Sequence, residues 1–258
     1  MTRNEQHSRD VWEEFWNKQD IDQVYGNSGR IIEQIERIGN VRGKWIMEIG
    51  AGSGRDGFRL VDLGANVILL DYATSSLAVI RDLADRLGKQ VYLVRADAFA
   101  LPFKSESIDI IFHQGLLEHF KKPEGILQQS YFVTKNGGHH VADVPQRYHI
   151  YTVVKHLLIW MNKWFAGWET EFSIGQLKQL FKRVGFDVYE TYGDWMRPSF
   201  IYRAVREVLK KAGLVLPQYP KPVALFAKIR RSLRRFMKRQ SISYYTFMDI
   251  GVVGMKKE

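Results

Sequence analysis

The stretch Ile46-Met47-Glu48-Ile49-Gly50-Ala51-Gly52-Ser53-Gly54-Arg55 decides the fold, because an apolar run ends there in a glycine-rich turn. Glycine in such a turn adopts positive φ and lets the backbone approach a ligand closely. A helix that begins directly after the turn presents free N–H groups and the positive end of its dipole. The stretch therefore predicts a strand, a ligand-binding loop and a helix in succession.

Short apolar runs alternate with helical stretches on the C-terminal side of this loop. The runs cover residues 45–49, 65–70, 90–94, 108–113 and 139–144. Continuous apolar strands separated by helices are typical of a parallel sheet that is buried on both faces. We therefore expect an α/β fold with a doubly wound, mostly parallel seven-stranded sheet and helices on both faces. Helical insertions are expected after strand five and before the last strand.

Four segments follow from these patterns. We expect an N-terminal helical cap over residues 1–40 and a ligand-binding α/β domain over residues 41–195, which contains an aromatic helical insertion near 148–168. A basic helical insertion over residues 196–244 precedes the last strand, 245–258, which completes the sheet. One helix is sharply bounded at Ile174–Val184, with Ser173 as a candidate N-cap and Gly185 as a candidate C-terminal glycine.

The composition narrows the class of protein. The chain has no cysteine, which excludes disulfides, thiolate metal sites and a cysteine nucleophile. Its start, MTRNEQHSRD, is too polar for a secretory signal, and no apolar run approaches the roughly 20 residues that span a bilayer. We therefore expect a cytoplasmic protein. The net charge of +10 favours polyanionic partners: nucleic acid, an anionic membrane surface or phosphorylated substrates.

The glycine loop departs from the dinucleotide fingerprint G-x-G-x-x-G, whose third glycine would stand at position 55. That position is Arg55, and Glu48 lies two residues before the first glycine. A carboxylate so close to the loop would repel a diphosphate and attract a cationic amine or sulfonium. An NAD-type dehydrogenase is therefore disfavoured.

The run from Glu48 to Gly54 resembles the E/D-x-G-x-G-x-G loop of class I S-adenosylmethionine-dependent methyltransferases. The resemblance covers about residues 45–190 and the final strand, and it implies S-adenosylmethionine as the cofactor. It implies that Asp71, ending the second strand, binds the ribose hydroxyls, and that Asp97, ending the third, faces the adenine amino group. The cofactor-binding set expected on this basis is Glu48, Gly50, Ala51, Gly52, Asp71, Tyr72, Asp97, Ala98 and Gln114. Taken singly, each aspartate fits a helix N-cap equally well, and a glycine turn can be only a turn.

His119 and Glu118, which follow the fourth strand, are the candidate catalytic residues. Methyl transfer mainly requires alignment of donor and acceptor, and a general base is needed only when the acceptor must lose a proton. Histidine can accept that proton near neutral pH. The alternative is a polar pair at the start of a helix. No metal-ligand spacing such as H-E-x-x-H appears, so we predict no metal.

Two segments outside the core pattern could bind the acceptor or a surface. Residues 148–168 are rich in Trp and Tyr, which fits either core packing or a wall for an apolar acceptor. Within residues 198–239, apolar positions share one helical face among many cations: Phe226, Ile229, Leu233, Phe236 and Met237. Such a basic amphipathic helix can lie on an anionic membrane; alternatively its apolar stripe packs on the sheet.

These features predict an S-adenosylmethionine-dependent methyltransferase that modifies oxygen or nitrogen of a small or lipid-like acceptor, anionic or membrane-associated. An RNA methyltransferase is the first alternative, although HQGLLEHF stands where an N/D-P-P-Y motif would follow strand four. A non-catalytic S-adenosylmethionine-binding or interaction module is the second. No protein partner is predicted.

Overall fold

The structure is a computed structural model that describes residues 3–18, 29–161, 169–195, 197–220, 224–238 and 240–257. Its helices are α1 (Arg3–Lys18), α2 (Arg30–Ile38), α3 (Arg55–Asp62), α4 (Thr74–Leu87), α5 (Glu124–Val133), α6 (Ile150–Trp160), α7 (Ile174–Val184), α8 (Phe200–Lys211) and α9 (Ala224–Lys238). Two short 3-10 helices are η2 (Leu117–His119) and η3 (Ser241–Tyr245). Its strands are β1 (Trp45–Ile49), β2 (Asn66–Asp71), β3 (Tyr92–Arg95), β4 (Ile108–Gln114), β5 (Thr134–Pro145), β6 (Phe186–Asp194) and β7 (Asp249–Lys256).

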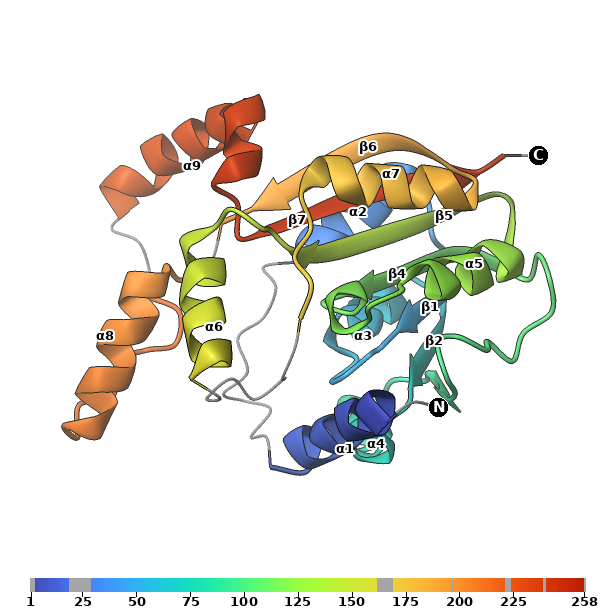
Figure 1. The fold of residues 1–258 in the computed structure, drawn as a ribbon, viewed down its shortest axis with the longest axis horizontal. Helices are drawn as coiled ribbons and strands as arrows, with labels where there is room; N and C mark the ends of the chain where they lie inside the picture. The colour runs from blue at the N-terminus through green and yellow to red at the C-terminus, as the bar shows by residue number, and fades with distance from the viewer. Residues whose placement is uncertain are drawn as a thin grey trace.

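These strands form one seven-stranded sheet in the order β3-β2-β1-β4-β5-β7-β6 (Figure 1). Strands β1 to β5 pair in parallel, and β7 runs antiparallel to both β5 and β6. The reversal of order at β1, with β2 on one side and β4 on the other, is the switch point of a doubly wound sheet. The expected fold class is confirmed.

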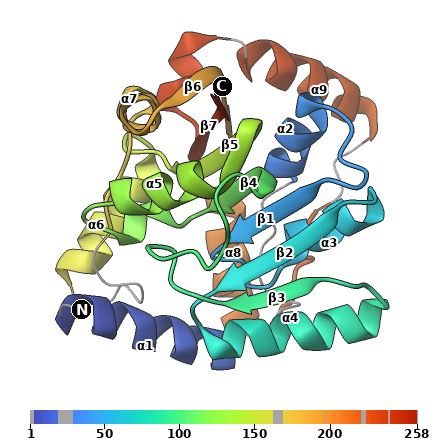
Figure 2. The ribbon, with the colours of Figure 1, turned by 90° about the vertical axis from the view of Figure 1, so that its right-hand side faces the viewer.

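Helices cover both faces of the sheet, as Figure 2 shows. Helices α2, α3 and α4 pack on one face, where Ile46 and Leu69 belong to the buried cluster. Helices α5 and α7 pack on the other, against Val144 and Ile250. Strand residues alternate between these faces, because successive side chains of a strand point to opposite sides.

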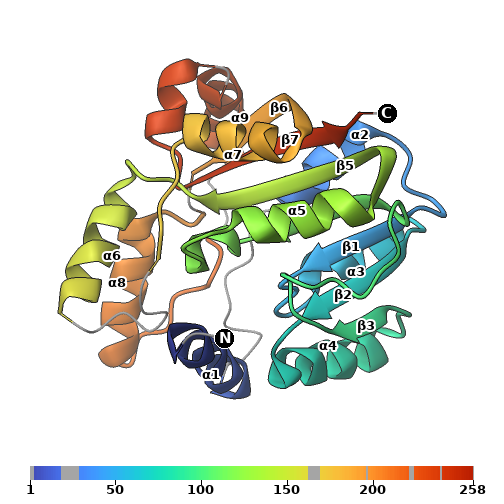
Figure 3. The same ribbon diagram turned by 45° about the vertical axis from the view of Figure 1, so that its right-hand side comes forward.

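The carboxyl ends of β1, β2, β4 and β5 lie at one edge of the sheet because these strands are parallel. Helices α1, α6 and α8 lie at this edge, and β5 points towards α6 (Figure 3). Ligands of open α/β sheets bind outside the carboxyl ends of the strands, near the switch point. The candidate site is therefore the space between the sheet edge and these helices.

Some element bounds differ from the expected ones. The last strand begins at Asp249 rather than at 245, because Ser243 organises a turn there. Its carbonyl accepts hydrogen bonds from the backbone N–H groups of Thr246 and Phe247, and its hydroxyl donates to the Met237 carbonyl. The expected bounds of α7 are confirmed: Ser173 and Gln176 form a capping box, and Gly185 has φ 116°. The division of the chain into four segments stays a prediction.

Candidate active site

The glycine loop between β1 and α3 has the backbone that the sequence predicts. Gly50, Gly52 and Gly54 have φ of 68°, 55° and 64°, in the left-handed region that favours glycine. The N–H groups of Gly50 and Ala51 both donate to the Leu70 carbonyl, at 2.8 and 3.1 Å. These bonds tie the loop to the end of β2, next to Asp71.

Asp71 connects the loop to the start of α4. One carboxylate oxygen accepts hydrogen bonds from the Gly52 N–H and the Ser76 hydroxyl, each at 2.9 Å, and the other accepts from the Ala73 N–H at 2.9 Å. Burial raises the pKa of Asp71, and these hydrogen bonds oppose that effect. Asp71 therefore orders the turn that leads into α4 and stands at the glycine loop, while its binding of ribose hydroxyls stays a prediction.

Glu48 points away from the turn, towards the start of α3. Its carboxylate accepts a hydrogen bond from the Gly57 N–H at 3.3 Å. Burial, followed by the charges of Asp56 and Asp71, raises the pKa of Glu48 well above its usual value. The raised pKa favours the protonated form of Glu48. Its hydrogen bond with Gly57 joins the end of β1 to the start of α3, beneath the loop. Its contact with the cofactor stays a prediction.

The remaining cofactor-binding candidates lie at neighbouring strand ends. Strand β3 ends at Arg95, so Asp97 lies in the turn after the strand rather than at its end. There the Asp97 carboxylate accepts a hydrogen bond from the Phe99 N–H at 2.9 Å, which holds the turn shut beside Ala98. The Arg95 guanidinium lies 5.7 Å from the centre of the Tyr72 ring, and Gln114 is the last residue of β4.

Helix α1 covers the loop, which the sequence did not indicate. A Cβ atom at Gly52 would come within 2.5 Å of the Trp16 ring. The Glu13 carboxylate accepts hydrogen bonds from the N–H groups of Thr74 and Ser75, at 2.6 and 2.9 Å, and so caps the start of α4. The Glu13 cap and the Trp16 contact together hold α1 across the carboxyl edge of the sheet. Because Glu13 lies 61 residues before Thr74, this cap leaves no local signal in the sequence.

His119 and Glu118 lie in η2, directly after β4, and differ in protonation. Burial lowers the pKa of His119, although the carboxylate of Glu169 opposes this. Burial also raises the pKa of Glu118 well above its usual value, and Glu169 adds to the rise. The Trp12 ring packs edge-on against His119, with centroids 5.0 Å apart. Burial therefore favours the neutral form of both side chains, the unprotonated imidazole and the protonated carboxyl.

Four other histidines divide between the core and the surface. His113 and His140 are fully buried in the sheet, with ring centroids 5.0 Å apart. Their four ring nitrogens contact no hydrogen-bonding partner within the described part of the chain. His139 bonds Tyr189, and His149 caps α6. None of these four joins the glycine loop.

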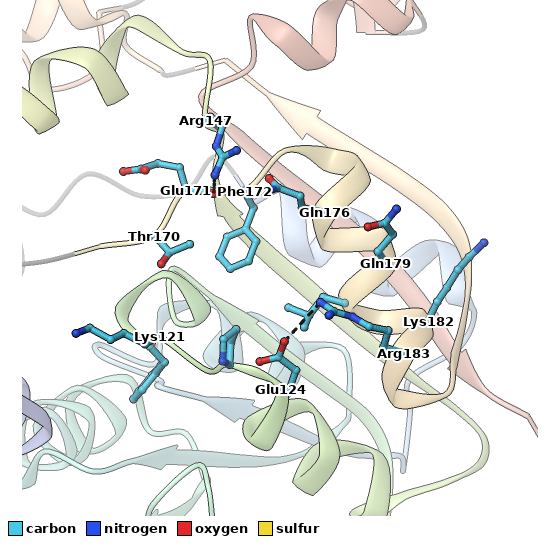
Figure 4. Close-up of a pocket in the computed structure, with 13 residues that line it drawn as sticks. Lys121, Glu124, Arg147, Thr170, Glu171, Phe172, Gln176, Gln179, Lys182 and Arg183 are labelled. Atoms are coloured by element: carbon cyan, nitrogen blue, oxygen red, sulfur yellow. Dashed lines mark hydrogen bonds and ion pairs between the residues drawn. The ribbon is translucent and has the colours of Figure 1, made fainter. Parts of the chain in front are cut away.

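A pocket of about 640 Å³ opens beside η2, between α5, α7 and residues 170–172 (Figure 4). It shares no residue with the glycine loop, Asp71 or Asp97. Its lining includes four cations: Lys121, Arg147, Lys182 and Arg183. Glu124 and Glu171 also line it, and Arg183 lies 3.5 Å from Glu124. The pocket adjoins the candidate catalytic residues through Phe120, which follows His119 in the chain, and through Thr170, whose N–H donates to the Glu118 carbonyl at 2.7 Å.

Comparisons with known proteins agree with this geometry. The methyltransferase domain family matches residues 47–142, which include the loop, Asp71, Asp97 and η2. These residues form a methyltransferase domain of the class I, S-adenosylmethionine-dependent type. The chain is 25% identical over 196 residues to a ubiquinone biosynthesis O-methyltransferase of Roseobacter denitrificans, covering 74% of this chain and 75% of the relative. It is 29% identical over 104 residues to a demethylmenaquinone methyltransferase of Renibacterium salmoninarum, covering 40% and 42%.

A solved S-adenosylmethionine-dependent methyltransferase of Mesorhizobium loti shares the fold of this methyltransferase. The TM-score is 0.60 at 16% identity, over 90% of this chain and all of the other. In the described ranges no three His, Asp or Glu side chains gather as metal ligands would. The helices that the structure describes include none with the length and apolarity to cross a membrane.

The loop of the methyltransferase fits its cofactor. Gly50, Gly52 and Gly54 hold the loop in the left-handed conformation that favours glycine, and the Asp71 carboxylate accepts a hydrogen bond from the Gly52 N–H beside it. Asp71, Asp97 and the loop glycines are the residues that would hold S-adenosylmethionine. The cofactor supplies an activated methyl group, so the protein has to bind, orient and exclude water.

Proposed function

We propose that this methyltransferase transfers the methyl group to an oxygen, or else a nitrogen, of a small lipid-like acceptor. The observation that carries the proposal is His119: an imidazole only 10% exposed, with a pKa that burial lowers, after the strand β4 that lies beside β1 and its glycine loop. A neutral imidazole there can take the proton that a hydroxyl must lose. The Roseobacter relative is a ubiquinone biosynthesis O-methyltransferase, which favours transfer to oxygen, and the acceptor of the Renibacterium relative, demethylmenaquinone, favours an apolar molecule.

The pocket beside η2 supports an anionic acceptor. Lys121, Arg147 and Lys182 line it together with Arg183, against two glutamates. One of these glutamates, Glu171, ion-pairs with Lys155, and the other lies near Arg183. The excess of cations favours a carboxylate or phosphate on the acceptor.

We further propose peripheral contact with an anionic membrane through residues 198–239. Helix α9 has a reversed polarity: cationic side chains face the protein and apolar side chains face solvent. Arg234 and Lys238 point inwards to the buried Asp194, at 2.5 and 3.3 Å. Its apolar side chains instead face solvent: Ile229, Leu233 and Phe236 are 65%, 59% and 61% exposed. The expected alternative, an apolar stripe packed on the sheet, is therefore wrong for these three residues. Phe226 and Lys228 lie outside the side chains that the structure describes.

Helices α8 and α6 repeat this reversed polarity. In α8, Arg206 is buried and donates to the Leu216 carbonyl, while Ile201 and Val208 are 74% and 67% exposed. In α6, Lys155 is buried while Val153 and Trp160 are 66% and 82% exposed. Figure 1 shows both helices at the carboxyl edge of the sheet. Exposed apolar side chains beside cations suit an interface with acidic lipid.

The acceptor is tested with S-adenosylmethionine labelled with tritium in the methyl group. The full chain is incubated with a bacterial lipid extract, total RNA or a protein extract, and label is counted in each. We expect transfer into the organic phase, greatly reduced in His119→Ala. Label in RNA alone would establish the RNA alternative, and no transfer to any fraction would favour a non-catalytic module.

The membrane contact is tested separately by sedimentation with phosphatidylglycerol vesicles. We expect wild-type protein to bind and to be released by salt. Leu233→Glu together with Phe236→Glu should abolish binding. Phe132→Glu is the matched control, since Phe132 is 53% exposed but lies in α5, on the opposite side of the fold. Equal binding by all three proteins would overturn the proposed surface.

A further inference from the structure

A buried ion-pair cluster lies beside His119. The Lys155 ammonium, on a side chain with no exposed surface, lies 2.7 Å from Glu169 and 3.0 Å from Glu171. Burial alone lowers the pKa of Lys155, but the two carboxylates outweigh this and raise it. The lysine is therefore charged, and it fixes Glu169 in one place.

The second carboxylate oxygen of Glu169 faces the candidate base. Lys155 holds the Oε2 atom of Glu169, and the Oε1 atom lies 4.0 Å from Nδ1 of His119. A carboxylate next to one ring nitrogen favours the tautomer whose proton is on that nitrogen. The lone pair of the histidine is then on Nε2.

The groups around His119 act in opposite directions on its pKa. Glu169 raises it, the charge of Lys155 lowers it, and the Gly115 backbone raises it. Trp12 packs against the ring from α1 and carries no charge. Glu118, the neighbouring acid, keeps its proton because burial raises its pKa. Glu169 is thus the carboxylate that can orient the imidazole.

We propose that Glu169, anchored by Lys155, is a positioning residue that orients His119 as the general base. This inference rests on the proposed transfer to a hydroxyl. In that step the acceptor oxygen bonds to the methyl carbon, and the carbon–sulfur bond breaks with its electron pair left on sulfur. The hydroxyl proton passes to Nε2 of His119 and then to water. The Glu169 carboxylate stabilises the imidazolium that forms.

The test reads the imidazole directly and needs no acceptor. The full chain is labelled with ¹⁵N-histidine, and the His119 signals are assigned by their loss in His119→Gln. Long-range ¹H–¹⁵N spectra across a pH titration give the tautomer and pKa of His119. In the wild type we expect the proton on Nδ1. In Glu169→Gln we expect a mixed tautomer and a pKa lower by about 1, since an ionised neighbour has been removed.

Two further variants separate positioning from folding. Glu171→Gln also removes a partner of Lys155, but Glu171 is not among the groups that shift His119, so we expect the His119 tautomer and pKa to stay as in the wild type. Glu169→Asp keeps the charge and should retain the Nδ1–H tautomer. An unchanged His119 tautomer and pKa in Glu169→Gln would overturn the inference. That result is distinct from failure of the proposed function, which would show as absent methyl transfer by the wild type.

Discussion

Trp16 of helix α1 lies against Gly52 of the glycine loop, so that a Cβ atom at position 52 would come within 2.5 Å of the indole ring. The contact joins the N-terminal helix to the backbone that would cradle the cofactor. Together with the Glu13 cap on α4, it makes α1 part of the binding site's wall. Residues that contact the loop from a separate helix should therefore affect cofactor affinity.

The first prediction concerns that contact. Gly52→Ala should lower the affinity for S-adenosylhomocysteine at least tenfold, because the new methyl group displaces Trp16 from the loop. Gly88→Ala is the matched control: its φ of 62° imposes similar backbone strain, but no atom lies within 4 Å of the new methyl group. Both variants should lose about 1 kcal/mol of stability from the left-handed conformation. Calorimetric titration measures the affinities, and equal affinities for the two variants would contradict the account.

The second prediction concerns the buried cluster. Lys155→Met should reduce the free energy of unfolding by about 3–5 kcal/mol, because it leaves two buried carboxylates without their cation. Lys135→Met is the control, since Lys135 pairs with Asp109 at 2.8 Å at the surface and its side chain is 39% exposed. Its loss should cost less than about 1 kcal/mol. Urea unfolding compares the two, and similar losses would mean that Lys155 is not buried with its partners.

The third prediction concerns acid stability. Burial lowers the pKa of His113 to about 3, and that of His140 well below its usual value. Both histidines bind protons near pH 6.5 in the unfolded chain but not in the folded chain. The free energy of unfolding is therefore highest above pH 6.5 and decreases as the pH falls below that value. His140→Phe suits the ring cluster with Phe181 and Phe186. Between pH 6.5 and 5 the variant should lose about 2 kcal/mol less than wild type. Urea unfolding at both pH values checks this, and parallel losses would refute it.

The sequence predicted the sheet because each buried strand carries its own local signal, a short Val- and Ile-rich run. The glycine loop and Asp71 were predictable for the same reason, since both follow directly from the strands that position them. Ser173 and Gly185 bounded α7 correctly because capping is a local interaction. The start of β7 was misplaced because Ser243 forms its turn with Met237, outside any strand pattern.

The rest of the site depends on contacts between distant segments. Glu13 caps α4 across 61 residues, and Glu169 reaches both Lys155 and His119. Nothing in the spacing of these residues indicates that they meet. The reversed polarity of α9 could not be predicted either. The helical pattern shows which residues share the apolar face, but not whether that face is turned to the protein or to solvent. Asp194, the residue that turns the cations inwards, lies 40 residues before Arg234.

The most direct test of the account is thermal unfolding of the full chain with S-adenosylmethionine, with S-adenosylhomocysteine and with NAD, in the wild type and in Asp71→Ala. A ligand at 100 times its Kd stabilises by about 2.7 kcal/mol, which for a chain of this size raises Tm by roughly 5–10 °C. We predict that rise with the two sulfur-containing ligands, none with NAD, and its loss in Asp71→Ala. Mass spectrometry first checks that the purified wild-type protein carries no bound ligand. If the Tm of such a protein is then unchanged by S-adenosylmethionine and by S-adenosylhomocysteine, the central claim is contradicted.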